Sequence, residues 1–315
     1  MKLSKEWMLG LIFLGLFIIM AICVPGFIDP YNLTSMLYQL PELGILSLGM
    51  MVVILTAGID LSITYLAALS GVVMAYALTA GLPVPVAMIA GTIAALIGGL
   101  LNGFFVAFIG VSPILVTLGT MTLFKGIILL ITKGNSVSGF PDSYSFIGNG
   151  DILGIPFPII VFAVIALLAW YLLNKTVWGR SVYMAGNNPI ATLFSGVNTK
   201  KVIMYVYLFS ALMAAIAAII MTSRYNSAKV DLGSSYQLQS IAVAVLGGTS
   251  ISGGYGKVIG VIFGTAIFQV LSSGLNLLGV PGMVINILIG VVLIAVLLIN
   301  FFTAKYKHNQ LKKAT

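Results

Sequence analysis

The sequence predicts an all-α integral membrane protein, with a single transmembrane domain over residues 1–315 and about ten spanning helices. Of the 315 residues, 60% are hydrophobic and 7% are charged, whereas a soluble domain carries about 25% charged residues. The apolar residues gather in runs of about 20, the length that crosses a bilayer as a helix. Basic residues flank these runs, which is the pattern that orients membrane proteins.

Short turns rich in glycine and proline, such as "AGLPVP" and "IGVSP", separate the expected spans. The first run follows Lys2 and Lys5 and is longer than the core of a cleaved signal peptide, so we expect it to remain as a span. The eighth run is short, and a re-entrant segment would reduce the total to about eight or nine. The predicted spans are residues 7–24, 36–57, 63–80, 85–108, 113–132, 156–173, 202–222, 237–252, 258–276 and 283–302.

Alternation along these spans predicts which loops share a side of the membrane. If Lys2 and Lys5 are cytoplasmic, the basic loop 174–201 and the basic C-terminal tail are cytoplasmic too. Segments 133–155 and 223–236 then lie outside. Both termini are therefore expected in the cytoplasm. The basic residues that do not follow this pattern are Lys125, Lys133, Arg224 and Lys229.

Small residues at four-residue spacing predict close contacts between helices. Gly99 and Gly103 form one such pair, and Gly256, Gly260 and Gly264 form a second series. The stretches "LTAGIDLSIT" and "VLGGTSISGG" are similar to each other, and "GVSP" and "GVPG" lie downstream of each. They predict either an internal repeat in parallel orientation or a chance likeness.

The residue types exclude most catalytic sites. His308 is the single histidine, so neither a Ser-His-Asp triad nor a two-histidine metal site can form. The glycine-rich "GGTSISGGYG" does not fit the G-x-x-x-x-G-K-[ST] pattern of a phosphate-binding loop. We therefore expect no enzyme activity, no cofactor and no metal. We attribute the net charge of +8 to basic residues that orient the protein in the membrane, and not to binding of nucleic acid.

Few ionisable residues lie inside the predicted spans. Glu42 and Lys125 lie about two turns from an outer helix end, where both side chains are expected to reach water. No intramembrane ion pair is predicted. A stand-alone secondary transporter or channel, which would need such pairs or a ring of charges, is therefore the weaker alternative, and energy for transport is expected from another subunit.

The stretch "TAGIDLSIT" places Asp60 at the cytoplasmic end of the second span. We expect Gly58, Asp60 and Ser62 to form an interfacial turn in which the carboxylate caps an amide at residues 61–63. The alternative is a gating contact at the inner mouth of a pathway.

The loop 174–201 predicts a short amphipathic helix. Asn188 suits the N-cap and Pro189 the first helical position, while Gly196 is a natural stop. Such a helix either lies on the lipid surface or inserts into a groove of a partner protein. Its apolar face is expected to contain Ile190, Leu193, Phe194 and Val197.

Long blocks in one order resemble a known family. "AGIDLS", "GLLNGFFVAFIGVSPILVTLGTMTLFKG", "GRSVYMAGNNPIATLFSGV" and "QSIAVAVLGGTSISGGYGKVIGVIFG" are similar to permeases of ATP-binding-cassette importers, in the branch for ribose-type sugars and autoinducer-2. Ala191 and Gly196 match the coupling pattern of EAA, three residues and Gly, whereas Ile190 and Thr192 depart from it. "NSAKVDLGSSY" looks somewhat like autoinducer-2 permeases. Permeases for branched-chain amino acids share the broad fold and are the alternative.

The resemblance implies a permease of the bacterial plasma (inner) membrane that imports a monosaccharide or similar small polar solute. A cytoplasmic ATP-binding subunit would bind ATP and contact Asn188–Gly196. A second permease subunit, identical or related, would complete the pore. An extracytoplasmic sugar-binding protein would dock on 133–155 and 223–236. The polar residues expected either to line the pathway or to form interhelical hydrogen bonds are Asn102, Thr120, Thr122, Gln269 and Asn276.

Overall fold

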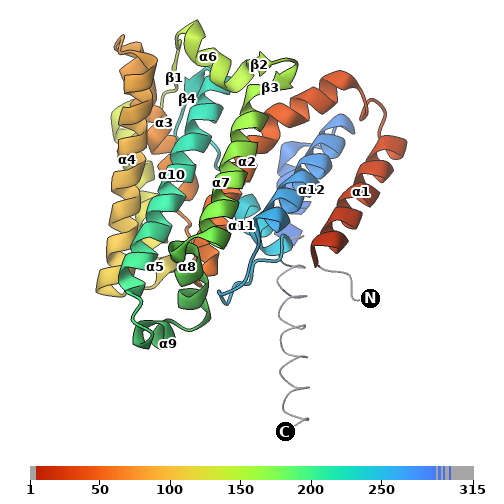
Figure 1. Ribbon diagram of the computed structural model, residues 1–315. Helices are drawn as coiled ribbons and strands as arrows, with labels where there is room; N and C mark the ends of the chain where they lie inside the picture. The colour runs from red at the N-terminus through yellow and green to blue at the C-terminus, as the bar shows by residue number, and fades with distance from the viewer. Residues whose placement is uncertain (1–4, 289, 292–293, 295–297, 299–315) are drawn as a thin grey trace.

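The computed structural model, shown in Figure 1, describes residues 5–288, 290, 291, 294 and 298. Within this part of the chain the fold is a bundle of helices, so the all-α prediction is confirmed. The helices are α1 (Lys5–Cys23), α2 (Pro30–Leu55), α3 (Ile63–Thr79), α4 (Val84–Phe104), the π-helix η1 (Phe105–Ile109), α5 (Pro113–Thr132), α6 (Asp142–Asn149), α7 (Phe157–Lys175), α8 (Val177–Asn187), α9 (Pro189–Phe194), α10 (Thr199–Tyr225), α11 (Tyr236–Leu246) and α12 (Val258–Leu277).

Two small antiparallel ribbons accompany the helices. Strand β1 (Val137–Ser138) pairs with β4 (Ser227–Ala228), and β2 (Asp151–Ile152) pairs with β3 (Ile155–Pro156). Both ribbons and α6 lie at one end of the bundle, while α9 lies at the other (Figure 1). The two ends therefore match the two sets of loops that alternation separates. Which end faces the cytoplasm stays a prediction.

In the described residues, seven helices are long and apolar enough to cross a membrane. They are α1, α2, α4 together with η1, α5, α7, α10 and α12. Helix α2 begins at Pro30, earlier than predicted, because Asp29 caps the amide of Tyr31. The predicted tenth span, 283–302, extends outside the part of the chain that the structure describes. Residues 282–288, which are described, are helical.

Two predicted spans are shorter than a full crossing. Helix α3 has 17 residues, and α11 has 11 residues, or about 16 Å at 1.5 Å per residue. The prediction that 237–252 forms one helix is wrong, because Gly247 and Gly248 end α11 and the chain continues in turns to α12. Irregular backbone at this depth is tolerated only where protein covers it. Here the amide of Gly254 donates to the carbonyl of Leu55 (2.9 Å).

The core of the bundle surrounds the second half of α2. Every residue from Pro41 to Leu55 is buried, which agrees with a sequence that is apolar on all sides of the helix. Helices α7, α10, α11 and α12 pack around it. The first half of α2 is more exposed, and Pro41 marks the change, since proline removes one backbone hydrogen bond of the helix.

The predicted close contacts at small residues are confirmed. A Cβ atom on Gly99 would lie 2.4 Å from the Cβ of Ala211, so α4 and α10 touch almost backbone to backbone. On α12, a Cβ on Gly260 would meet the carbonyl oxygen of Gly247, and one on Gly264 would lie 2.7 Å from that of Val243. These glycines seat α12 against α11.

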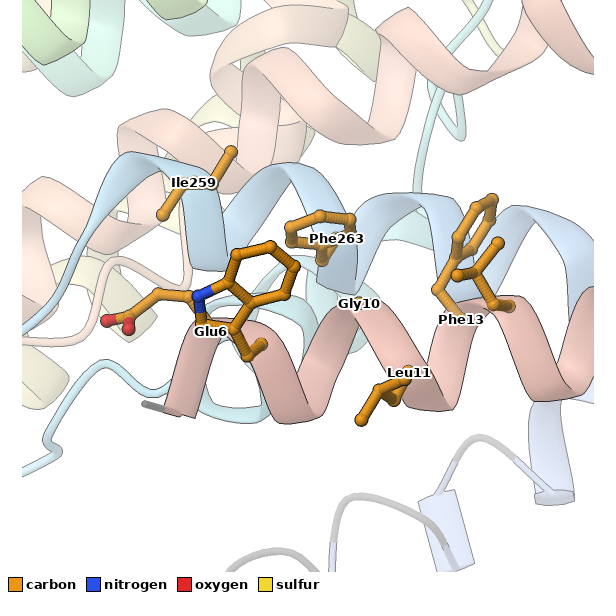
Figure 2. Close-up of a pocket in the computed structure, with 8 residues that line it drawn as sticks. Glu6, Gly10, Leu11, Phe13, Ile259 and Phe263 are labelled. Carbon is orange, nitrogen blue, oxygen red and sulfur yellow. The ribbon is translucent and has the colours of Figure 1, made fainter. Parts of the chain in front are cut away.

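Helix α1 lies at the edge of the bundle and packs on α12. The Nζ of Lys257 lies 2.6 Å from a carboxylate oxygen of Glu6, and this hydrogen bond raises the pKa of Lys257. Beside the pair, Gly10, Phe13 and Phe263 line an apolar groove (Figure 2). Its lining fits the acyl chains of surrounding lipid.

Candidate functional site

Helix α9 forms as predicted and is tightly specified. The Oδ1 of Asn188 accepts a hydrogen bond from the amide of Ala191 (2.9 Å), and Pro189 occupies the first helical position. Buried Thr192 donates back to the carbonyl of Asn188 (2.7 Å). Gly196 has φ +81°, the left-handed conformation in which glycine ends helices.

The outward face of α9 is apolar and exposed. The exposed fraction is 68% for Ile190, 58% for Leu193 and 87% for Phe194. Val197, which was predicted on the same face, is instead half-buried and packs against the core. An apolar patch on a short helix outside the membrane spans is typical of a binding surface.

The neighbouring elements hold α9 in place. Before it, α8 packs so closely that a Cβ on Gly186 would collide with the carbonyl of Leu55 at the end of α2. The hydroxyl of Tyr183 on α8 donates to the carbonyl of Gly256 in the turn before α12 (2.8 Å). After α9, Asn198 caps the first turn of α10. Helix α9 is therefore attached to α8 and α10, which contact the core helix α2.

The Asp60 turn lies inside the bundle. Asp60 is 1% exposed, and Gly58 and Ser62 are also buried, so protein surrounds the turn. Its position at the membrane interface stays a prediction. The Oδ1 of Asp60 accepts from the amide (3.0 Å) and the hydroxyl (2.6 Å) of Ser62, as the amide-capping prediction requires. Its Oδ2 accepts from Ser210 of α10 (2.9 Å).

A chain of neutral side chains extends from this turn. Thr120 of α5 donates to the Oδ1 of Asn102 (2.7 Å), and the Nδ2 of Asn102 donates to the hydroxyl of Ser62 (2.8 Å). The hydroxyl of Ser62 then donates to Asp60. Asn102 and Thr120 thus form the interhelical hydrogen bonds that the sequence offered as one alternative. Their part in transport stays a prediction.

Two backbone carbonyls of the turn also accept hydrogen bonds from side chains. Thr117 donates to the carbonyl of Ile59 (3.0 Å), and Gln237 of α11 donates to that of Leu61 (3.0 Å). Five helices, α3, α4, α5, α10 and α11, therefore converge on residues 59–62. We call Asp60, Ser62, Asn102, Thr120 and Ser210 the inner network.

The other predicted pathway residues lie elsewhere. Thr122 is exposed on α5 and donates to the carbonyl of Gly119 in its own helix (2.7 Å). Gln269 is buried in α12, and Asn276 is exposed near the end of that helix. None of the hydrogen bonds that join the inner network comes from α12 in the described part of the chain.

A second cluster, which the sequence did not predict, forms around a buried carboxylate near the end of α10. Glu42 is 0% exposed, so the expectation that it reaches water is wrong. Its Oε1 lies 2.7 Å from the Nε of Arg224. Its Oε2 accepts from the hydroxyls of Tyr236 (2.8 Å) and Tyr225 (3.1 Å). We call these four residues the outer cluster.

The outer cluster also overturns the expectation that the spans hold no ion pair. Arg224 lies in the last turn of α10, a 27-residue helix that passes beside α2, and packing brings it to Glu42. Two signals in the sequence pointed to it. Glu42 interrupts an apolar run, and Arg224 is a basic exception at the same predicted end of the bundle.

Comparison with known proteins decides the family. Residues 32–297 match the family described as "Branched-chain amino acid transport system / permease component". The chain belongs to this family of ATP-binding-cassette importer permeases. It is thus a multi-pass membrane protein and a permease subunit, and subunits of this family lack ATPase domains.

Several curated permeases are similar over nearly their whole length. The permease is 41% identical over 292 residues to the ribose import permease protein RbsC of Bacillus subtilis, with 91% of each chain covered. It is 39% identical over 307 residues to RbsC of Haemophilus influenzae, with 93% of each chain covered. It is 32% identical over 307 residues to the autoinducer 2 import system permease protein LsrD of Escherichia coli, covering 94% and 92%. No solved structure matches the permease.

Proposed function

We propose that this permease imports a monosaccharide of the ribose type, driven by a separate cytoplasmic ATP-binding subunit. The names of the relatives support the substrate class, with autoinducer-2 as a chemically related second candidate. Branched-chain amino acids are the alternative, because the family model carries that description. A second permease subunit and an extracytoplasmic binding protein would complete the importer.

The observation that carries the proposal is the exposed apolar face of α9. An unpartnered phenylalanine at 87% exposure costs free energy in water, and a groove on a partner removes that cost. Helix α9 is too short to be stable alone, so its firm attachment to α8 and α10 suits the transmission of force. Binding of ATP by the partner would favour one of two conformations of the pore by differential affinity.

The direct test is association with the ATPase subunit. Phe194→Glu is expected to reduce co-purification of that subunit by about tenfold or more, because a carboxylate replaces an apolar anchor, while membrane insertion is unchanged. The matched control is Leu153→Glu, which changes a 98% exposed apolar residue at the opposite end of the bundle. If Phe194→Glu combined with Leu193→Glu still co-purifies fully, α9 lies on lipid and the coupling assignment is wrong.

Transport itself provides the second test. The reconstituted complex is expected to hydrolyse ATP faster when a sugar-loaded binding protein is added. If neither the permease nor the loaded binding protein changed the rate of ATP hydrolysis, the result would contradict an importer. Stimulation by a binding protein loaded with L-leucine, and not with D-ribose, would favour the amino-acid alternative.

A further inference from the structure

We propose that a polar cavity between the end of α10 and the start of α11 is a monosaccharide-binding subsite of the permease. The proposal rests on the proposed function and identifies where the sugar first contacts this chain. The cavity has a volume of about 490 Å³, within the range of small-molecule pockets. It is lined by Tyr225, Ser227, Lys229, Asp231, Leu232, Gly233, Ser234, Ser235 and Tyr236.

The polar groups of the cavity suit a neutral polyol. The Nζ of Lys229 and the Oδ1 of Asp231 lie 3.5 Å apart, and both side chains are about half exposed. They offer a donor and an acceptor without net charge, and the hydroxyls of Ser234 and Ser235 offer both. A sugar presents donors and acceptors in the same way around its ring. An anion would instead need a cation that is not already paired.

The two tyrosines are held in fixed positions. The hydroxyls of Tyr225 and Tyr236 both donate to Glu42, so one end of each ring is anchored in the bundle. The guanidinium of Arg224 lies 4.6 Å from the centre of the Tyr225 ring and restricts it further. The rings can therefore present apolar surface to the C–H groups of a sugar with little loss of side-chain entropy.

The backbone around the cavity is fixed as well. Leu232 is 3% exposed and anchors the loop to the core. Gly233 has φ +68°, and a Cβ there would lie 3.1 Å from the sulfur of Met221. The pairing of β4 with β1 ties the start of the loop to the same end of the bundle. The cavity is thus largely formed without a ligand, as small-molecule sites usually are.

Two other cavities of the permease differ from this one in their lining. The groove of Figure 2 and a second groove between α7 and α12, lined by Phe162, Ala166 and Ile262 among others, are almost entirely apolar. They match lipid chains. The α10–α11 cavity lacks a comparable apolar wall, so it favours a sugar over the aliphatic side chain of a branched-chain amino acid.

Protection from labelling tests the site directly. Cys23 is replaced by Ser, and Ser234→Cys is introduced at the cavity. The complete importer in vesicles is treated with a membrane-impermeant maleimide, with unloaded binding protein or with binding protein and D-ribose. We expect D-ribose to slow labelling of Ser234→Cys about fivefold or more, whereas L-leucine has no effect. Ser143→Cys on α6, exposed at the same end and outside the cavity, is expected to label equally in all samples.

A functional variant completes the test. The exposed pair is removed by Lys229→Ala with Asp231→Ala, which is expected to lower the D-ribose transported per ATP hydrolysed about tenfold. Co-purification of the ATP-binding subunit should be unchanged, because the pair directly follows β4, which lies at the opposite end of the bundle from α9 (Figure 1). Asp142→Asn on α6 is the control.

The outcomes separate the two proposals. If the unaltered importer transports D-ribose but D-ribose does not change the labelling rate of Ser234→Cys, the subsite is wrong and the proposed function stands. If the importer transports L-leucine and not D-ribose, the proposed function is wrong and the sugar subsite falls with it. Equal slowing at Ser234→Cys and Ser143→Cys would assign the effect to docking of the binding protein and overturn the subsite.

Discussion

The permease buries two carboxylates in different ways. In the inner network, the groups that hydrogen-bond to Asp60 in the described part of the chain are neutral, namely the amide and hydroxyl of Ser62 and the hydroxyl of Ser210. In the outer cluster, Glu42 is paired with a guanidinium and two phenols. Desolvation of a charge is costly in both places, but only the outer cluster offsets it with an opposite charge. The outer cluster therefore depends on its cation, whereas the inner network depends on its geometry.

The largest expected effect comes from removing that cation. Arg224→Leu leaves the Glu42 carboxylate buried without a charge partner, which costs about 3–5 kcal/mol for pairs of this kind. We expect a corresponding loss of unfolding free energy, measured by titration with sodium dodecyl sulfate in mixed micelles. The double variant Glu42→Leu with Arg224→Leu should recover most of the loss, because no buried charge remains. A double variant as unstable as Arg224→Leu alone would show that the pair is not the source of the stability.

The two clusters also show which features of the structure could be predicted from the sequence and which could not. Apolar runs and turn residues predict helices, since both effects are local, and most span boundaries therefore agree with the structure. The glycine series at Gly99 and Gly260 predicted close packing because only small residues permit it. Asn188 and Gly196 predicted the ends of α9 for the same local reason.

Contacts between distant residues could not be predicted in this way. Glu42 and Arg224 are far apart in the sequence, and their pairing depends on how α2 and α10 pack. The surroundings of Asp60 depend on side chains that α4, α10 and α11 bring to residues 60–62. Lys125 is the opposite case, since it is exposed on its helix, with its ammonium 5.9 Å from the ring centre of Tyr65. That it reaches water stays a prediction.

A moderate effect is expected when the inner carboxylate is removed. Asp60→Ala leaves the donors of Ser62 and Ser210 without their acceptor, and we expect a loss of about 2–3 kcal/mol of unfolding free energy. Asp60→Asn is the matched control, because its carbonyl still accepts from Ser62 and its amide can donate to Ser210. It should cost about 1 kcal/mol or less.

Transport by Asp60→Asn then separates the two roles of this residue. Near-normal uptake would agree with a network held by geometry. Lost uptake in a folded complex that still hydrolyses ATP would indicate that the negative charge itself takes part in gating, and would make the two clusters more alike than their contacts suggest.

The smallest effect is expected at the hydrogen bond from Ser210 of α10 to Asp60. Ser210→Ala removes a single neutral donor to Asp60, and Ser62 still occupies the other oxygen, so we expect a loss of about 1 kcal/mol. The control is Ser47→Ala, in which an equally buried hydroxyl donates only to the carbonyl of Leu43 in its own helix. That change should cost less, since the helix retains its backbone hydrogen bond.

The size of the Ser210→Ala effect also reports the charge on Asp60. A hydrogen bond to an ionised acceptor contributes about 1.5–3 kcal/mol, more than a bond to a neutral one. A measured loss near 3 kcal/mol would therefore mean that Asp60 is held as a carboxylate by neutral donors, namely the amide and hydroxyl of Ser62 and the hydroxyl of Ser210. A loss equal to that of Ser47→Ala would mean that α10 and the Asp60 turn are joined by packing. Because α10 follows α9 in the chain, such a result would also exclude this hydrogen bond as a link between α9 and the core.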